Sequence, residues 1–190
     1  MSLKLAVIVC STRPGRVGIS IARWFEAYAK EHGGFEVMLE DLADYDLPVF
    51  DEPHHPRLRK YEHDHTKAWS AAVERADAFV FVTPEYNYGP PPSFVNAMNY
   101  LVLEWQNKVA GFVSYGGVSG GIRAVQSEKL MLTSFKIMPL PEQVMIPMFP
   151  QHLDEQKNFI PNEIHLTSAK TLLDELARWG AALKAMRAGG

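Results

Sequence analysis

The sequence holds a single cysteine among its 190 residues. One cysteine excludes a disulfide within the chain, and it excludes a zinc or iron–sulfur site built on several cysteines. The sequence also lacks a surplus of positive charge, because 19 Lys and Arg stand against 22 Asp and Glu and give a net charge of -3. Phosphate backbones and anionic lipid attract basic surfaces. We therefore expect neither nucleic acid nor a membrane as a partner.

The N-terminal part has no long hydrophobic run. Its apolar stretch, residues 5–10, is too short for a signal-peptide core or a membrane span, and Arg13 and Arg16 follow it closely. Together with the single cysteine, this pattern favours a cytoplasmic protein. A chain with 47% hydrophobic residues and this length is sufficient for one globular domain, which we expect to occupy residues 1–190.

Short apolar runs alternate with amphipathic stretches along the chain. Continuous β-branched and aromatic runs predict strands at 5–10, 35–39, 78–82, 109–113 and 143–146. Apolar residues at helical spacing predict one helix that ends near 132, and others over 21–29, 69–76, 94–103 and 169–183, the last with Ser168 as candidate N-cap. This alternation favours an open parallel α/β sheet, in which ligands bind at the carboxyl ends of the strands.

The turn after the first predicted strand, residues 11–18, reads STRPGRVG. Its hydroxyls, its two guanidinium groups and the backbone N–H groups at a helix start are groups that bind a dianionic phosphate. The alternative is a polar turn that only caps the helix. The turn lacks the Gly-Lys-Ser/Thr of a Walker loop and is not a Gly-x-Gly-x-x-Gly turn, so neither an ATPase nor an ordinary Rossmann dehydrogenase is indicated.

Two further turns follow predicted strands. Residues 83–90 place the phenols of Tyr86 and Tyr88 on a backbone stiffened by proline, and such a surface suits a planar heterocycle. Taken singly, these tyrosines could equally be loop anchors. The third turn, residues 116–121, contains four glycines, which would let a flat ligand approach the main chain closely.

The segments STRPGR at 11–16, PEYN at 84–87 and GGVSGG at 116–121 occur in one order and spacing. With them the whole chain resembles the NADPH-dependent FMN reductases of the flavodoxin-like superfamily. The resemblance implies a flavodoxin-like three-layer α/β sandwich whose five-stranded parallel sheet has the order 2-1-3-4-5. It also implies that hydride passes from NADPH or NADH through bound FMN to a small acceptor, namely a quinone, an azo compound, a flavin or a metal ion, by a ping-pong mechanism.

The resemblance further implies which residues bind FMN. The phosphate would be held by Ser11, Arg13, Arg16, Val17, Gly18 and Ile19. The ring would be flanked by Pro84, Glu85, Tyr86, Asn87 and Tyr88, and its pocket completed by Ser114, Tyr115, Gly116, Gly117, Ser119 and Gly120. Because a flavin stores the electrons, we expect no catalytic side chain and no acid–base pair.

Two other functions compete with this interpretation. Cys10 and Arg16 have the C-x5-R spacing of low-molecular-weight tyrosine phosphatases, but Pro14 lacks a backbone N–H, Val17 replaces a Ser or Thr, and the chain has no Asp-Pro pair. A flavodoxin-like electron carrier without its own NAD(P)H activity is the second alternative. Such carriers are usually much more acidic than -3, because they dock basic partners.

The segment 41–62 has no periodicity, and we expect it to be a long functional or interface loop. It could contact a neighbouring subunit in a homodimer or homotetramer. Several histidines and carboxylates lie in and near it, but their spacing does not form a recognised ligand set, so we expect no metal site at His54, His55, His63, His65, Glu52, Glu62 or Asp64.

Overall fold

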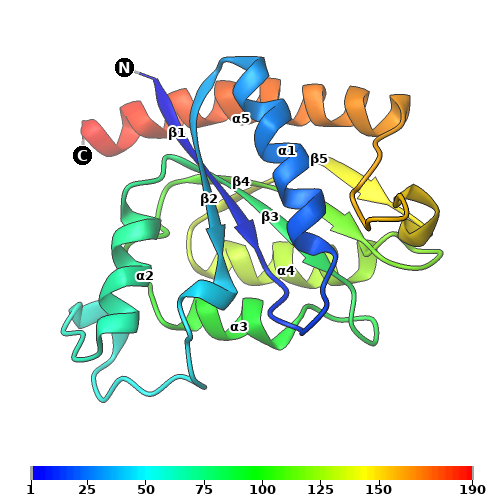
Figure 1. The fold of residues 1–190 in the computed structure, drawn as a ribbon. Helices are drawn as coiled ribbons and strands as arrows, with labels where there is room; N and C mark the ends of the chain where they lie inside the picture. Colours follow the sequence, from blue (N-terminus) through cyan, green and yellow to red (C-terminus); the bar gives the residue numbers. More distant parts are fainter. Residues whose placement is uncertain (1, 190) are drawn as a thin grey trace.

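The computed structural model describes residues 2–189, and its five parallel strands form one sheet in the order β2-β1-β3-β4-β5 (Figure 1). The strands are β1 (Leu3–Val9), β2 (Phe35–Asp41), β3 (Ala78–Pro84), β4 (Val109–Tyr115) and β5 (Met138–Ile146). The helices are α1 (Gly18–His32), α2 (Asp64–Glu74), α3 (Pro92–Asn99), α4 (Ile122–Ser134) and α5 (Glu163–Ala188). The predicted flavodoxin-like architecture and strand order are therefore confirmed.

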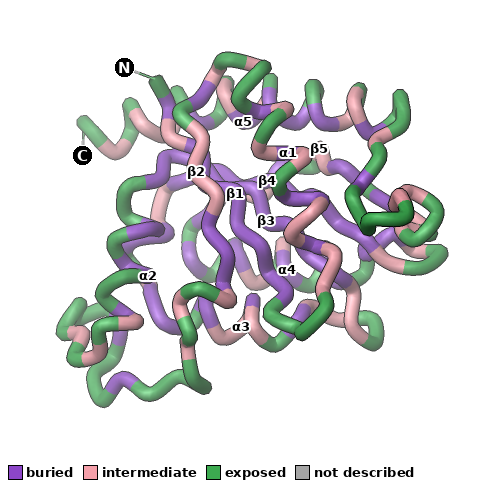
Figure 2. The backbone as a smooth tube through the Cα atoms, in the orientation of Figure 1, coloured by how far each residue is buried: buried purple, intermediate pink, exposed green. Residues whose placement is uncertain are grey.

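Helices cover both faces of the sheet, which explains why its central strands β3 and β4 are mostly apolar and buried along their whole length. Every residue of β3 and of β4 is buried. The core on one face packs α1 and α5 against the sheet, and the core on the other face packs α2, α3 and α4 against it. Figure 2 shows the result as a buried sheet and buried inner helix faces between exposed loops.

Several boundaries differ from the sequence-based prediction. Strand β5 begins at Met138, five residues before the predicted start, although it contains Pro139 and Pro141. Prolines are tolerated there because β5 is an edge strand, and its pairing with β4 shifts register between Ala110 and Phe112. Helix α3 ends at Asn99 rather than near 103.

The prediction that Ser168 caps the last helix is wrong. Helix α5 begins at Glu163, and Asn162 is its N-cap. The Asn162 Oδ1 accepts from the His165 backbone N–H at 3.0 Å, and the His165 Nδ1 accepts from the Asn162 N–H at 3.1 Å. This capping box satisfies two backbone donors at the start of the helix, and its cap Asn162 lies six residues before the predicted cap.

The irregular segment 41–62 is anchored to α3 rather than free in solution. Asn96 donates to the Pro48 carbonyl at 2.6 Å and accepts from the Phe50 N–H at 3.0 Å. The Tyr100 hydroxyl donates to Asp51 at 2.8 Å. The segment contains two short 3-10 turns, Leu42–Asp44 and Pro56–Leu58. Among the described residues, no helix is long and apolar enough to cross a bilayer.

Candidate functional site at the carboxyl edge of the sheet

The three turns singled out in the sequence follow β1, β3 and β4, so parallel strand order brings them to the same edge of the sheet. Side chains join them in pairs. The Ser11 Oγ and the Tyr86 hydroxyl are 2.7 Å apart and link the first turn to the second. Glu85 links the second turn to the third, because its carboxylate accepts from the Ser119 Oγ at 3.0 Å and from Arg123 Nη1 at 2.8 Å. The three turns therefore form one braced unit.

The first turn presents groups that can bind an anion. Helix α1 starts at Gly18, and no side chain of the described residues caps its N-terminus at Val17. Its first backbone N–H groups therefore lack a side-chain acceptor, and the helix dipole favours negative charge there. Arg13 is exposed in the same turn and has no ion-pair partner among residues 2–189. These groups fit a phosphate.

Arg16 has different surroundings from those expected for a group that faces the phosphate. It is ion-paired with Asp41 at the carboxyl end of β2, and Asp41 also accepts from the Ala43 N–H at 3.0 Å. The Arg16 Nε is buried and has no hydrogen-bond partner among the described residues. The pair therefore ties the first turn to β2 and leaves one donor of Arg16 unused.

The second turn has a strained backbone. Tyr86 and Gly89 exchange two backbone hydrogen bonds of 3.0 Å across Asn87 and Tyr88, whose φ values are +50° and +69°. Two positive φ angles inside such a pair of bonds define a type I′ turn. A tyrosine rarely adopts this conformation, and strain of this kind is often found at ligand sites. The Arg123 guanidinium lies over the exposed Tyr88 ring at 4.2 Å.

Most glycines of the third turn are required by close contacts and by backbone angles within the turn itself. The Ser114 Oγ donates to the Gly120 carbonyl at 2.7 Å, and a Cβ at Gly121 would lie 3.0 Å from Ser114. Gly120 and Gly121 also have φ of +58° and +85°. Gly117 is different, because a Cβ there would meet nothing within 4 Å. Gly117 is therefore the glycine of this turn that faces open space.

Glu85, which was expected to flank the ring, and Tyr115, which was expected to complete its pocket, have side chains that contact other parts of the protein. The Glu85 carboxylate points into the third turn. Burial raises its pKa, but hydrogen bonds from Arg123 and Ser119 outweigh burial and leave the pKa below its usual range. The Tyr115 ring is buried beside the first turn, where its hydroxyl would lie 2.5 Å from a Cβ at Gly18. Burial raises the pKa of Tyr115, so this phenol stays neutral.

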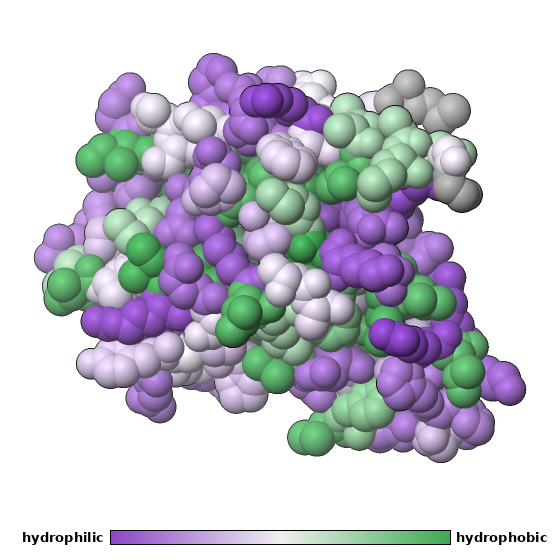
Figure 3. All heavy atoms as spheres, turned by 180° about the vertical axis from the view of Figure 1, so that it is seen from behind, coloured by the Kyte–Doolittle hydropathy of each residue, from purple (hydrophilic) through white to green (hydrophobic). Residues whose placement is uncertain are grey.

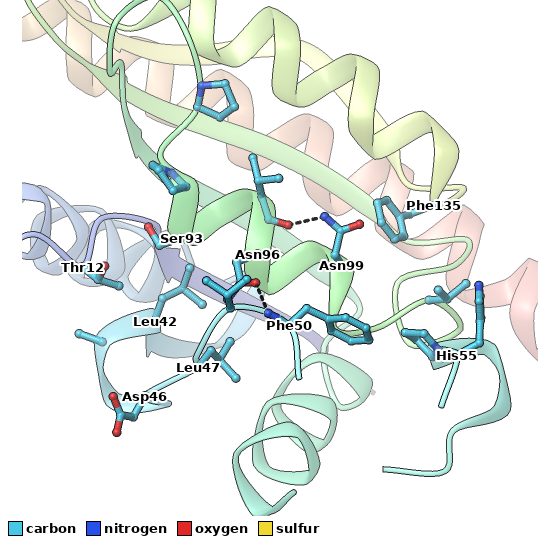
Figure 4. Close-up of a pocket in the computed structure, with 17 residues that line it drawn as sticks. Thr12, Leu42, Asp46, Leu47, Phe50, His55, Ser93, Asn96, Asn99 and Phe135 are labelled. Carbon is cyan, nitrogen blue, oxygen red and sulfur yellow. Dashed lines mark hydrogen bonds between the residues drawn. The ribbon is translucent and has the colours of Figure 1, made fainter. Parts of the chain in front are cut away.

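An apolar hollow of about 1120 Å³ lies next to the first and second turns, between α3 and the segment 42–56 (Figure 4). We call it the α3 hollow. It reaches the site edge at Thr12, Pro90 and Ser93. Figure 4 shows Phe50 and Asn96 side by side on its wall. The hollow is therefore continuous with the edge that carries the three turns.

Sequence reasoning missed Asp41, Thr83, Arg123 and Glu128. The signal for Glu128 was available, because it occupies a core-facing position of α4 one turn from Ala124 and is fully buried. An acidic residue in an apolar stripe marks a special environment. Asp41 and Arg123 gave no such signal, because their partners are distant in the sequence.

The residues at this edge fit FMN. A dianionic phosphate matches the uncapped start of α1 and the exposed Arg13, which has no ion-pair partner within residues 2–189. A planar ring matches a strained tyrosine turn opposite a glycine turn with open space at Gly117. A family model described as NADPH-dependent FMN reductase matches residues 3–151. The chain belongs to this family.

Individual relatives support the family assignment. The chain is 42% identical over 125 residues to an NAD(P)H-dependent FMN reductase of Schizosaccharomyces pombe, a match that covers 65% of this chain and 62% of that protein. It is 33% identical over 150 residues to an NAD(P)H-dependent FMN reductase of Nectria sp., covering 76% and 75%. The flavoenzyme NAD(P)H:(acceptor) oxidoreductase of Paracoccus denitrificans has the same fold, with a TM-score of 0.74, 18% identity, and coverage of 95% and 98%.

As a member of the NADPH-dependent FMN reductase family, the chain is an oxidoreductase whose cofactors are FMN and NAD(P)H.

Cys10 does not have the surroundings of a phosphatase nucleophile. The residue is fully buried, and burial, followed by the charges of Glu128 and Asp41, raises the pKa of its thiol well above the usual range. A nucleophilic cysteine needs a lowered pKa and access to the substrate. The phosphatase alternative is therefore wrong.

Proposed function

We propose that this reductase passes hydride from NAD(P)H to bound FMN and then delivers electrons to a small planar acceptor such as a quinone, in a ping-pong sequence. The observation that carries the proposal is the bracing of three turns into one unit by Glu85 and by the Ser11–Tyr86 contact. A single braced edge offers one place for a flat ligand. Donor and acceptor would therefore use that place in turn.

The first turn would hold the phosphate of FMN. Arg13 would form an ion pair with it, and the backbone N–H groups of Gly18 and Ile19 would donate to it at the uncapped start of α1. Arg16 would offer its Nε donor, which has no partner among the described residues, from a position fixed by Asp41. Ser11 would orient Tyr86 through their mutual hydrogen bond, as well as contact the phosphate.

The second and third turns would hold the ring. Backbone groups of residues 84–88 would bind its polar edge on one side, and Gly116 and Gly117 would let the main chain approach it on the other. When bound, FMN accepts hydride and stores two electrons, so the protein supplies orientation and electrostatics rather than an acid–base group. Tyr88, which has a strained backbone, would lie at the rim of the flavin site. Its ring is exposed, and the Arg123 guanidinium lies over one face of it.

Initial-rate kinetics with NADPH and a quinone test the order of events. If donor and acceptor share one place, double-reciprocal plots are parallel at different fixed acceptor concentrations. Intersecting lines would show that donor and acceptor bind together and would contradict the shared site. The same assay distinguishes a reductase from an electron carrier. Consumption of NADPH without a partner reductase would exclude the carrier.

We also propose that the protein is a homodimer or homotetramer, with the segment 41–62 at a subunit contact. Val49 in this segment is 89% exposed and Phe50 is 37% exposed, and both line the α3 hollow. A second copy would remove this apolar surface from water. Sedimentation velocity at micromolar concentration tests the proposal: a dimer or tetramer supports it, and a monomer contradicts it.

A further inference from the structure

The site sits above a buried acid, Glu128, that has no counter-ion in the part of the chain that the structure describes. Glu128 on α4 is fully buried, and its Oε1 lies 2.6 Å from the Thr83 Oγ1 near the end of β3. Its second oxygen, Oε2, is buried and has no hydrogen-bond partner among residues 2–189. A buried carboxylate with one unsatisfied oxygen is costly, whereas a neutral carboxylic acid is tolerated.

The surroundings of Glu128 favour the neutral form. Burial raises its pKa to about 8, and the hydrogen bond from Thr83 opposes this only in part. No charged side chain of the described residues contributes to that pKa. Cys10, directly after β1, is the titratable neighbour, and its thiol stays protonated because burial raises its pKa well above the usual range. Glu128 is therefore protonated at neutral pH and ionises in mildly alkaline solution.

Thr83 connects this acid to the second turn. Its Oγ1 lies 2.6 Å from Glu128 and also 3.4 Å from the carbonyl oxygen of Pro84, where the turn begins. The hydroxyl has one proton and can donate it to only one of these acceptors. Neutral Glu128 can donate its own proton to Thr83, so that Thr83 donates to Pro84. Ionised Glu128 instead accepts a hydrogen bond from the Thr83 hydroxyl. The Pro84 carbonyl then has no hydrogen bond from Thr83.

We propose that Glu128 is a positioning residue of the flavin site, which acts through Thr83 on the turn that begins at Pro84 and makes FMN affinity depend on its own protonation. This inference rests on the proposed binding of FMN at the three turns. Ionisation of Glu128 places a negative charge beneath a site for an anionic ligand and removes a hydrogen bond from the turn. We expect FMN binding to weaken roughly three- to tenfold as Glu128 ionises.

The test measures the dissociation constant of FMN from pH 7 to pH 9 by quenching of flavin fluorescence, using apoprotein from which flavin has been removed. The FMN phosphate, with a second pKa of about 6, keeps its charge over this range. Wild-type protein should lose affinity in a single-proton transition. Glu128→Gln cannot ionise and should keep the affinity of the neutral form at every pH. Thr83→Val removes the connecting hydroxyl and should also flatten the profile.

Infrared spectroscopy of the apoprotein gives a second readout that needs no flavin. The carboxylic acid band of Glu128 should disappear over this pH range in wild type and should be absent from Glu128→Gln. In Thr83→Val the band should persist to higher pH, because the hydrogen bond from Thr83 lowers the pKa of Glu128. A wild-type affinity that is constant from pH 7 to 9 would overturn the proposal, even if the variants did not fold. A transition that persists in Glu128→Gln would also overturn it.

Another group could titrate in the same range. Lys108 is buried, which lowers its pKa to about 8, but it donates to the Val73 and Glu74 carbonyls at the C-terminus of α2. It precedes β4 and so lies at the opposite edge of the sheet from the three turns. A transition caused by Lys108 would survive in Glu128→Gln. If FMN did not bind at any pH, the proposed function would fail, whereas binding without a pH transition would refute only the role of Glu128.

Discussion

Arg13 and Arg16 lie three residues apart in one turn, but they have different electrostatic surroundings. Arg16 is neutralised by Asp41, whereas Arg13 is exposed and has no acidic partner among the described residues. Spacing in the sequence indicated two equivalent guanidinium groups. The difference arises from β2, which brings Asp41 to Arg16 from a distant part of the chain. Arg13 is therefore the side chain on which phosphate binding should depend most.

Arg13→Ala should leave the protein folded and weaken FMN binding. A charge-assisted hydrogen bond contributes about 1.5–3 kcal/mol, so we expect a loss of roughly ten- to a hundredfold in affinity. Isothermal titration of the apoprotein with FMN measures the effect. Arg178→Ala is the matched control, because this exposed arginine on α5 changes the net charge equally. Equal affinity for wild type and Arg13→Ala would exclude the first turn from the site.

At the scale of elements, most helices and strands could be predicted because their apolar periodicity reports burial directly. The limits of α5 and β5 could not. Ser168 is a good capping residue by type, but the tertiary fold extends α5 to Asn162, where His165 completes the box. The prolines of β5 argued against a strand and are accepted because β5 lies at the edge. Local sequence propensity reveals neither the earlier start of α5 nor the edge position of β5.

The start of α5 should depend on pH through His165. Burial, and then the nearby His152, lowers the pKa of His165 from 6.5 to about 4. The unfolded chain thus binds the proton more readily than the folded chain, so the stabilisation from neutral His165 is complete above pH 6.5 and is lost as the pH falls through 4. Neutral Nδ1 accepts from Asn162, and protonation removes that acceptor.

Melting temperatures test this dependence. We expect His165→Gln to melt below wild type at pH 7, and the difference to shrink between pH 6.5 and pH 4. His54→Gln, at an exposed histidine of the 41–62 segment, is the control and should show no such convergence. A difference for His165→Gln that is the same at pH 7 and pH 4 would show that the imidazole does not act through its neutral form.

In the third turn the fold requires Gly121, whereas we expect ligand binding to require Gly117. Gly117→Trp should keep the melting temperature of wild type, because space at this position is open, and should abolish measurable FMN binding. Gly121→Ala should lower the melting temperature, because φ is +85° and a Cβ would contact Ser114 at 3.0 Å. Leu130→Trp places the same indole on the exposed side of α4 as a control. Normal FMN binding by Gly117→Trp would place the ring elsewhere.

At the scale of the whole molecule, the fold and the place of the site could be predicted because parallel strand order alone brings three turns to one edge. The contacts that join those turns could not be predicted from the sequence. The Glu85 carboxylate braces the third turn, and the buried Glu128 contacts Thr83. The rear surface mixes hydrophobic and hydrophilic residues (Figure 3). The α3 hollow adjoins the site and is lined in part by the apolar side chains of Leu47, Val49 and Phe50.

The central claim is that this chain binds FMN at the three turns and reduces it with NAD(P)H. The most direct test is the visible spectrum of the purified, flavin-loaded protein when NADPH is added without oxygen or any acceptor. The account predicts that the absorption of oxidised flavin survives desalting, disappears in proportion to added NADPH, and returns when a quinone is supplied. A protein that retains oxidised flavin unchanged in excess NADPH would contradict it.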